Sequence, residues 1–321
     1  MAGPGQASRT ERKCSAAAQI LGLEGDAHGL AESLPDLVAE AMRISLNVSH
    51  GIHGRRRAGP GETFWQFRQY ETSDAATLVD WRRSASSDHL FVREREWEAA
   101  HTIWLWPDLS PSMAFKSHLS SVTKRDRALV LIMAAAELLV RGGERVGLLG
   151  LTRPNASRKA ARRIAEAIAG NLNSPMLAES LPPPERLTRL SGVLLASDFL
   201  DPLPEIEARL QVLAASNVFG HLIQILDPAE ETLPYDGRTE FTALEGADRW
   251  TADRVESLRP QYIEKLAAHR AGLEAMARKF GWSLLTHRTD RPAAEPLLAL
   301  IMRMQSGAKD YRWMSGTGGA S

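Results

Sequence analysis

The chain of 321 residues has little cysteine, no net charge and no long apolar run. Its single cysteine, Cys14, excludes an intrachain disulfide framework and a cysteine-based zinc site within one chain. Lys and Arg together number 39, as do Asp and Glu, so the chain as a whole lacks the basic excess typical of nucleic-acid binders. No secretory signal is visible, and the longest apolar run, Ala128–Ala136, is too short to span a bilayer. We therefore expect a soluble, cytoplasmic protein without membrane insertion.

The balanced total hides two oppositely charged stretches. Residues 116–163 carry 11 basic and 3 acidic side chains, a net charge of +8, whereas residues 195–256 carry 13 acidic and 4 basic side chains, a net charge of −9. The basic stretch leaves nucleic-acid binding as an alternative function, although no folded nucleic-acid motif accompanies it.

Composition divides the chain into four parts. We expect residues 1–33 and 306–321 to be tails, the first of them disordered, residues 34–99 to form a small N-terminal unit that contains β-structure, and residues 100–305 to form the main domain. In the small unit, Phe64–Tyr70 and Leu90–Trp97 have strand-like patterns, and Trp81 is expected to be buried against the main domain. The triplet Arg55–Arg57 lies in a glycine-rich stretch, where a solvated loop is the simplest interpretation.

In residues 100–305, buried strands alternate with helices. Strands are predicted at Thr102–Trp106, Arg145–Leu151, Gly192–Ser197, Val218–Leu226 and Trp282–Thr286. The helices between and after them are predicted at Ser121–Val140, Ser157–Ala169, Pro204–Ala215, Thr251–Phe280 and Pro292–Met304. This alternation is typical of an α/β fold with a doubly wound, mostly parallel sheet. The long connection at 230–248 is predicted to hold a hairpin of Thr232–Tyr235 with Thr239–Leu244.

The clearest functional motif, Asp108-x-Ser110-x-Ser112, directly follows the first predicted strand of the main domain. One carboxylate and two hydroxyls at alternate positions of a loop offer the hard oxygen ligands that Mg²⁺ prefers. Asp198 follows another predicted strand, and ligands of open parallel sheets bind at the carboxyl ends of strands. We therefore predict that Asp108, Ser110, Ser112 and Asp198 hold Mg²⁺ or another divalent cation. The alternative is that Asp108 caps a turn and the serines bond to the loop backbone.

These motifs carry a resemblance to a known family. Residues 100–305 resemble a von Willebrand factor A domain, whose metal-ion-dependent adhesion site (MIDAS) begins with Asp-x-Ser-x-Ser. More narrowly, residues 35–305 resemble the bacterial domain of unknown function 58 family. The stretches that carry the resemblance are Gly59–Phe64, Arg68–Tyr70, Asp74, Val79–Trp81, Ser84–Ala85, Phe91–Glu94, Asp108–Met113, Ser197–Phe199, Leu226–Pro228 and Thr286–Asp290.

The resemblance implies a von Willebrand factor A-like fold and a non-enzymatic role in protein interaction. In the strand order that it implies, residues 116–163 and 195–256 would form opposite flanks of one domain, where their fields would orient an approaching partner. Members of the family are often encoded beside a MoxR-type AAA+ ATPase and are thought to act with it in assembling or maturing client proteins. The chain departs from the family pattern at Ser73 and Ser86, and residues 171–180 supply Ser174 and Ser180 but lack the threonine of a full adhesion site. We therefore expect an incomplete metal site of weak affinity.

The expected function is that of an adaptor or co-chaperone of such an ATPase, which binds partners through the adhesion site. A metal-assisted phosphate hydrolase at the same strand ends is an alternative, with Asp198 as the second acid it would need. The sequence has no Gly-x-x-x-x-Gly-Lys phosphate loop, His-Glu-x-x-His motif or Gly-x-Ser-x-Gly elbow. We therefore favour binding over catalysis.

Overall fold

The computed structural model describes residues 29–30, 32–49, 64–70, 79–85, 87, 89–95, 101–189, 191–242 and 249–315. The chain divides into two compact units, one formed by Met1–Gly51 together with His101–Ser321 and the other by Ile52–Ala100. Some parts of the sequence analysis fall outside the described residues, namely residues 1–28, Arg55–Arg57, residues 59–63, Ser73, Asp74, Ser86, residues 96–97, residues 243–244 and residues 316–321.

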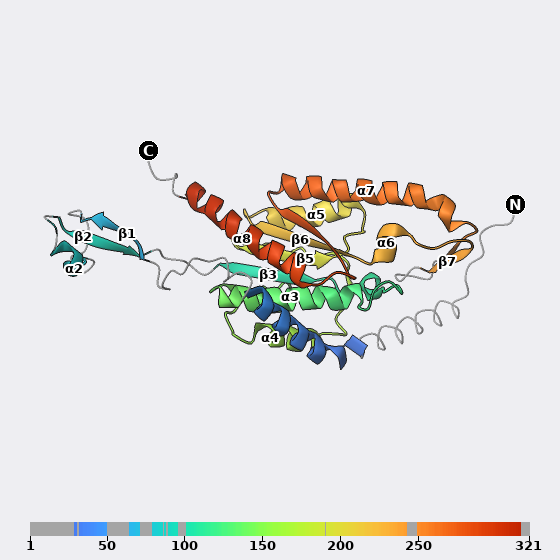
Figure 1. The fold of residues 1–321 in the computed structure, drawn as a ribbon, viewed down its shortest axis with the longest axis horizontal. Coiled ribbons are helices and arrows are strands. Elements are labelled where there is room, and N and C mark those ends of the chain that lie inside the picture. Colours follow the sequence, from blue (N-terminus) through green and yellow to red (C-terminus); the bar gives the residue numbers. More distant parts are fainter. Residues whose placement is uncertain are drawn as a thin grey trace. The chain divides into compact units, whose positions relative to one another are not determined.

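A five-stranded parallel sheet forms the centre of the larger unit (Figure 1). Its strands are β3 (Thr102–Pro107), β4 (Arg145–Leu148), β5 (Gly192–Ser197), β6 (Phe219–Leu226) and β9 (Ser283–Arg288). Their order across the sheet is β4-β3-β5-β6-β9, and every neighbouring pair is parallel. The central strand β5 is buried along its whole length, which explains its continuous apolar sequence. The predicted α/β alternation and parallel sheet are confirmed.

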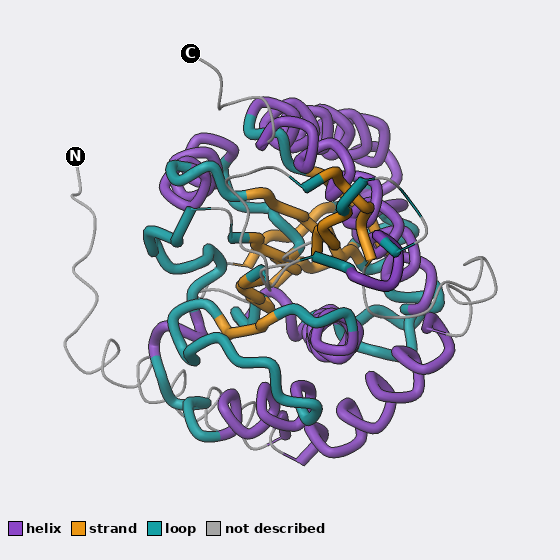
Figure 2. The backbone as a smooth tube through the Cα atoms, turned by 90° about the vertical axis from the view of Figure 1, so that its left-hand side faces the viewer, coloured by secondary structure: helices purple, strands orange, loops and turns teal. Residues whose placement is uncertain are grey.

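Helices cover both faces of this sheet (Figures 1 and 2). On one face, α3 (Lys124–Arg141) contacts β3, β4 and β5, and α4 (Ala160–Ala169) contacts α3. On the other face, α5 (Leu203–Ala214) and α7 (Val255–Lys279) share a hydrophobic cluster with residues of β5 and β6. This burial of apolar surface on both faces positions the strand ends and the loops that follow them.

Two helices differ from the division expected from the sequence. A helix over residues 32–49 belongs to the unit that holds the sheet, not to the small unit. Its apolar side chains at helical spacing are buried, namely Leu34, Leu37, Ala41, Ile44 and Val48. The last helix, α8 (Ala294–Ser315), runs past its expected end at Met304.

The described residues of the smaller unit form a two-stranded antiparallel sheet and a short helix. The strands are β1 (Phe64–Gln69) and β2 (Phe91–Arg95), and the helix is α2 (Trp81–Ser84). Asp80 caps α2 by accepting a hydrogen bond from Arg83 N at 3.1 Å. Its own unit leaves the side chain of Trp81 65% exposed, and the burial of Trp81 against the main domain stays a prediction. The single turn of α2 buries Ser84, whose Oγ accepts from Phe91 N at 2.9 Å.

The predicted hairpin of Thr232–Tyr235 with Thr239–Leu244 is wrong. The strand β7 (Thr239–Thr242) pairs with β8 (Arg249–Ala252), and Thr232 ends a short helix, α6 (Pro228–Thr232). A capping box begins α6, because Asp227 Oδ1 accepts from Ala229 N and Glu230 Oε2 accepts from Asp227 N, each at 2.8 Å. This local pattern, Asp-Pro-x-Glu, favours a helix where the sequence analysis expected a strand.

The strand order agrees with the expected separation of the two charged stretches. The strand β4, in the basic stretch, lies on one side of β3, and β6, in the acidic stretch, lies on the other. The two stretches are in contact at Lys124. This residue belongs to the basic stretch, and its ammonium bonds to Asp198 and Glu230 of the acidic stretch. The two stretches therefore meet at the carboxyl edge of the sheet.

Candidate functional site

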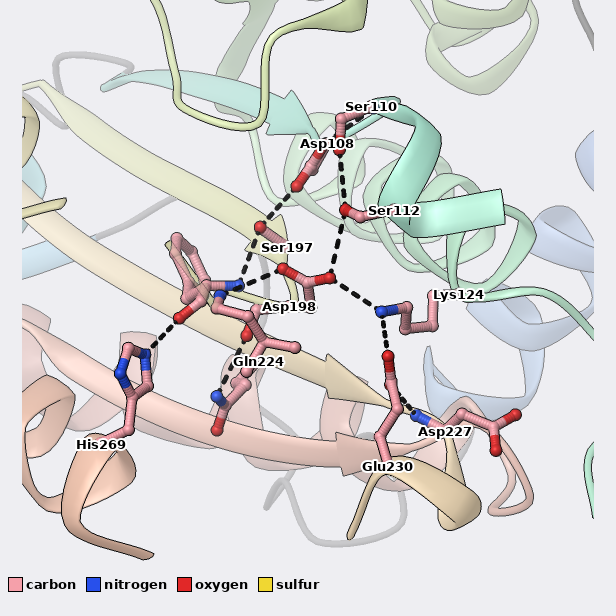
Figure 3. Close-up of polar contacts among 12 residues, drawn as sticks. Asp108, Ser110, Ser112, Lys124, Ser197, Asp198, Gln224, Asp227, Glu230 and His269 are labelled. Carbon is pink, nitrogen blue, oxygen red and sulfur yellow. Dashed lines mark hydrogen bonds and ion pairs between the residues drawn. The ribbon is translucent and has the colours of Figure 1, made fainter. Parts of the chain in front are cut away.

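The strand order reverses between β3 and β5, because the chain forms β3 first, adds β4 on one side and then β5 on the other. Open α/β sheets bind ligands at this switch point, outside the carboxyl ends of the strands. Asp108 follows β3 directly, and Asp198 follows β5 directly. Figure 3 shows the polar side chains at this point. We define the strand-end cluster as Asp108, Ser110, Ser112, Lys124, Ser197, Asp198 and Glu230.

Asp108 is completely buried, and both of its carboxylate oxygens accept hydrogen bonds (Figure 3). Its Oδ1 accepts from Ser110 N at 2.9 Å, and its Oδ2 accepts from Ser197 Oγ at 2.6 Å. Burial, followed by the nearby Asp198 carboxylate, raises the pKa of Asp108 from 3.8 to about 7. Ser110 Oγ lies 3.1 Å from Ser112 Oγ. The Asp-x-Ser-x-Ser side chains therefore converge on one point.

Asp198 joins this motif to a lysine. Its Oδ2 accepts from Ser112 Oγ at 3.3 Å and from Lys124 Nζ at 2.8 Å, and its Oδ1 accepts from Leu200 N at 3.2 Å. The structure thus brings together all four residues that the sequence predicted, and it adds a cation that the sequence analysis missed.

The loop that carries Asp198 is held in a strained conformation. Phe199 has a left-handed φ of 49°, which is uncommon for a residue with a large side chain. Ser197 Oγ accepts from Phe199 N at 3.0 Å, and His269 Nε2 donates to Phe199 O at 2.6 Å. Gln224 Nε2 donates to the Asp198 carbonyl at 3.1 Å. These bonds from β5, β6 and α7 fix the direction of the Asp198 side chain.

Lys124 is the first residue of α3 and is 1% exposed. Besides Asp198, its Nζ bonds to Glu230 Oε1 at 2.5 Å. Burial alone would lower the pKa of Lys124, but the carboxylates of Asp198 and Glu230 raise it above the usual value of 10.5. The side chain is therefore a buried ammonium held between two carboxylates.

One signal in the sequence points to Lys124. It stands one helical turn before Ala128, at the start of the buried apolar face of α3, where a charged residue needs a partner. No local sequence pattern identifies that partner, because Asp198 is 74 residues away and Glu230 is 106 residues away.

The region expected to lack a threonine ligand contributes nothing to the strand-end cluster. Ser180 Oγ donates to Asp201 Oδ1 at 2.8 Å, and Ser174 is the residue before the 3₁₀ helix η3 (Pro175–Ala178). The oxygen ligands of the predicted metal site are therefore limited to the motif itself and Asp198.

The strand-end cluster does not fit a divalent cation as it stands. Asp198 Oδ2, the oxygen that faces Ser112, already accepts from the Lys124 ammonium. A divalent ion on the same oxygen, at about 4 Å from the ammonium, would meet a repulsion of about 8 kcal/mol at an effective dielectric constant near 20. Within the described part of the chain, no group of three or more His, Cys, Asp or Glu side chains is placed to hold a metal ion. A cation of the chain itself, the Lys124 ammonium, lies 2.8 Å from Asp198 Oδ2.

Asp108→Asn is expected to change how stability depends on pH. The folded pKa of Asp108, about 7, exceeds its unfolded value of 3.8, so the folded state binds the extra proton between these values. In the wild type this carboxyl therefore makes stability fall as pH rises from about 4 to 7, by up to about 1.4 kcal/mol per pH unit. The variant should lose this contribution and gain stability relative to the wild type as pH rises. Urea unfolding at several pH values measures the difference.

Two buried histidines act in the opposite direction and do not disturb this comparison. Burial, followed by Arg303, lowers the pKa of His221 to about 4, and burial, followed by Arg127, lowers the pKa of His287 to about 3. Their stabilisation is complete above pH 6.5 and is lost as pH falls, equally in both proteins. A constant difference between wild type and Asp108→Asn from pH 4 to pH 7 would contradict the pKa assigned to Asp108.

The fold and the strand-end cluster define an α/β protein with a polar site at the switch point of a parallel sheet. The chain belongs to the family described as protein of unknown function DUF58, which it matches over residues 66–272. An uncharacterized protein of Mycobacterium tuberculosis is 28% identical over 302 residues, which cover 85% of this chain and 92% of that protein. An uncharacterized protein of Mycobacterium avium is 33% identical over 138 residues, 40% of this chain and 75% of that protein.

Two solved structures also align with the chain. The conserved hypothetical protein BatB from Bacteroides thetaiotaomicron is 14% identical, with a TM-score of 0.37 over 64% of this chain and 100% of that one. An aerotolerance-related membrane protein from Bacteroides fragilis is 14% identical over the same shares, with a TM-score of 0.36. Similarities at this level add nothing to the functional argument. Among the residues with described structure, no helix combines the length and apolar character that a membrane span requires.

Proposed function

We propose that this protein is a non-enzymatic interaction module, an adaptor or co-chaperone of a MoxR-type AAA+ ATPase, and that it binds its partner at the carboxyl edge of the sheet. The ATPase and its client come from the family resemblance alone. The von Willebrand factor A-like arrangement is supported by the strand order, with the second strand on one side of the first and the later strands on the other.

The observation that carries the proposal is a large exposed apolar side chain on each of three segments that follow neighbouring strands. Leu119 follows β3 and is 42% exposed, Leu200 follows β5 and is 41% exposed, and Trp250 lies beyond β6 and is 56% exposed. Apolar side chains within a polar rim are typical of protein interfaces, and tryptophan is enriched among the residues that dominate binding energy.

Hydrogen bonds fix the backbone at two of these residues before any partner binds, and ring stacking orients the third side chain. Leu200 N donates to a carboxylate of the strand-end cluster, and Leu119 N donates to Ser117 Oγ at 3.1 Å. Trp250 stacks on Phe241, with ring centroids 5.7 Å apart and planes at 28°. A surface ordered in advance loses less conformational entropy on association, which favours a binding role.

The hydrolase alternative is less favoured by the same geometry. A general base must reach the proton of a water or substrate. Asp108 is completely buried with both oxygens accepting hydrogen bonds, and Asp198 already accepts from three donors. Hydrogen bonds and an ion pair within the protein therefore occupy both carboxylates, which is typical of structural groups and not of a general base.

Trp250→Ala is expected to weaken binding to a purified MoxR-type ATPase from the same genome by about tenfold or more, because truncation of a central interface tryptophan removes much of the binding energy. Leu200→Ala should weaken it less. The matched control is Met42→Ala, since Met42 is similarly exposed, at 44%, but lies on the helix over residues 32–49. Biolayer interferometry measures all three affinities. Equal affinity for Trp250→Ala and Met42→Ala would rule out this surface, and no binding by the wild type would rule out the partner.

A further inference from the structure

We propose that Lys124 is the resident cation of the strand-end cluster: its ammonium, bonded to Asp198 and Glu230, supplies the positive charge that a divalent ion supplies in a metal-ion-dependent adhesion site, so that the cluster is complete without metal. This inference deepens the proposed function, on which it rests for the role of the site. The measurements below concern the cluster itself and need no partner.

A cation at the position of Lys124 does not stabilise α3. It is the first residue of the helix, where the positive end of the helix dipole disfavours a cation. It is also 1% exposed, and lysine is almost never fully buried without a partner. The helix dipole and burial therefore both disfavour the ammonium, and the carboxylates of the strand-end cluster offset both effects.

The contacts of the ammonium resemble those of a bound ion. Nζ lies 2.8 Å from Asp198 Oδ2 and 2.5 Å from Glu230 Oε1. Ser112 Oγ donates to the same Asp198 oxygen, so the ammonium meets the adhesion motif through a shared carboxylate. The ring of Phe115 lies 5.8 Å from Nζ and adds a cation–π contact. The charge of one side chain thus interacts with residues that follow β3, β5 and β6.

Glu230 completes the arrangement as an internal ligand. Its Oε1 bonds to the ammonium, while its Oε2 accepts from Asp227 N at 2.8 Å. In an adhesion site, a carboxylate of the partner completes the metal shell; here a carboxylate of the same chain bonds to the cation. Its side chain is 17% exposed, so the ion pair reaches towards the surface of the protein.

Removing the ammonium should convert the cluster into a metal site. Without Lys124, the carboxylates of Asp198, Glu230 and Asp108 and the two motif hydroxyls have no counter-charge. An oxygen-only set of carboxylates and hydroxyls is what Mg²⁺ and Mn²⁺ bind. Metal binding by a variant but not by the wild type is therefore the specific consequence of the proposal.

Thermal unfolding with and without millimolar Mg²⁺ or Mn²⁺ tests it on the full chain. The wild type should show the same Tm under all conditions. Lys124→Met keeps the apolar stem and should lose on the order of 10 °C without metal, then recover part of the loss, saturably, with metal. Lys124→Arg, which keeps the charge, should not respond to metal. The double variant Lys124→Met/Asp198→Asn should not respond either, because the shared carboxylate is gone.

Three results would overturn the proposal: a saturable rise in the wild-type Tm with Mg²⁺ or Mn²⁺, a Lys124→Met variant as stable as the wild type, or a Lys124→Met variant that folds but ignores metal. If Lys124→Met does not fold, electron paramagnetic resonance measures whether the wild type binds Mn²⁺. Saturable Mn²⁺ binding by the wild type refutes the proposal. No Mn²⁺ binding by the wild type, together with a folded Lys124→Arg variant, supports it. None of these results bears on ATPase binding, so the proposed function and this inference fail separately.

Discussion

Asp198→Ala is expected to lower the free energy of unfolding by about 3–5 kcal/mol, the range found when one partner of a buried ion pair is removed. The substitution leaves the Lys124 ammonium, 2% exposed as a side chain, with Glu230 as its remaining carboxylate. Ser112 Oγ and Leu200 N lose their acceptor at the same time. Urea unfolding measures the loss, and Asp198→Asn should cost less because the amide oxygen still accepts.

The matched control is Asp253→Ala. Asp253 also forms an ion pair with a basic residue, Arg238, but at 3.8 Å and with a side chain 91% exposed. An exposed pair contributes little, so this control should stay within about 0.5 kcal/mol of the wild type. Similar losses for the two alanine variants would mean that the Lys124–Asp198 contact does not form in solution.

Trp282→Ala is expected to lower the free energy of unfolding by about 3–5 kcal/mol, as truncation of a core tryptophan does. Trp282 is 5% exposed, belongs to the hydrophobic cluster under α5 and α7, and donates from Nε1 to Val218 O at 2.8 Å. Its indole packs directly over Gly220 of β6, where an added Cβ would overlap the ring. Gly220→Ala alone should therefore cost about 1–3 kcal/mol through overpacking.

The two substitutions should be strongly non-additive. In the Trp282→Ala background the ring is gone, so the methyl group of Gly220→Ala has space and should cost little. A double-mutant cycle by urea unfolding measures this coupling, with Leu131→Ala in place of Gly220→Ala as a control, because Leu131 is fully buried in α3 on the other face of the sheet. Additive losses for the Gly220 and Trp282 variants would show that the ring does not lie over β6.

Some parts of the fold follow from local patterns in the sequence. A strand buried on both faces needs a continuous apolar stretch, as in Gly192–Ser197, and helices between such strands require a parallel sheet. Residues 232–235 show the limit of this reasoning. A capping box at Asp227 outweighed the strand pattern that followed it.

The sequence by itself determined the sheet and the meeting of Asp108 with Asp198, because the carboxyl ends of parallel strands share one edge. Only the tertiary structure decided which cation balances these carboxylates. Lys124 and Glu230 are 106 residues apart, and their pairing depends on how α3 and α6 pack at the strand ends. Electrostatic attraction acts through space and leaves no periodic pattern along the chain, so the sequence suggested a metal ion where the folded chain places its own ammonium.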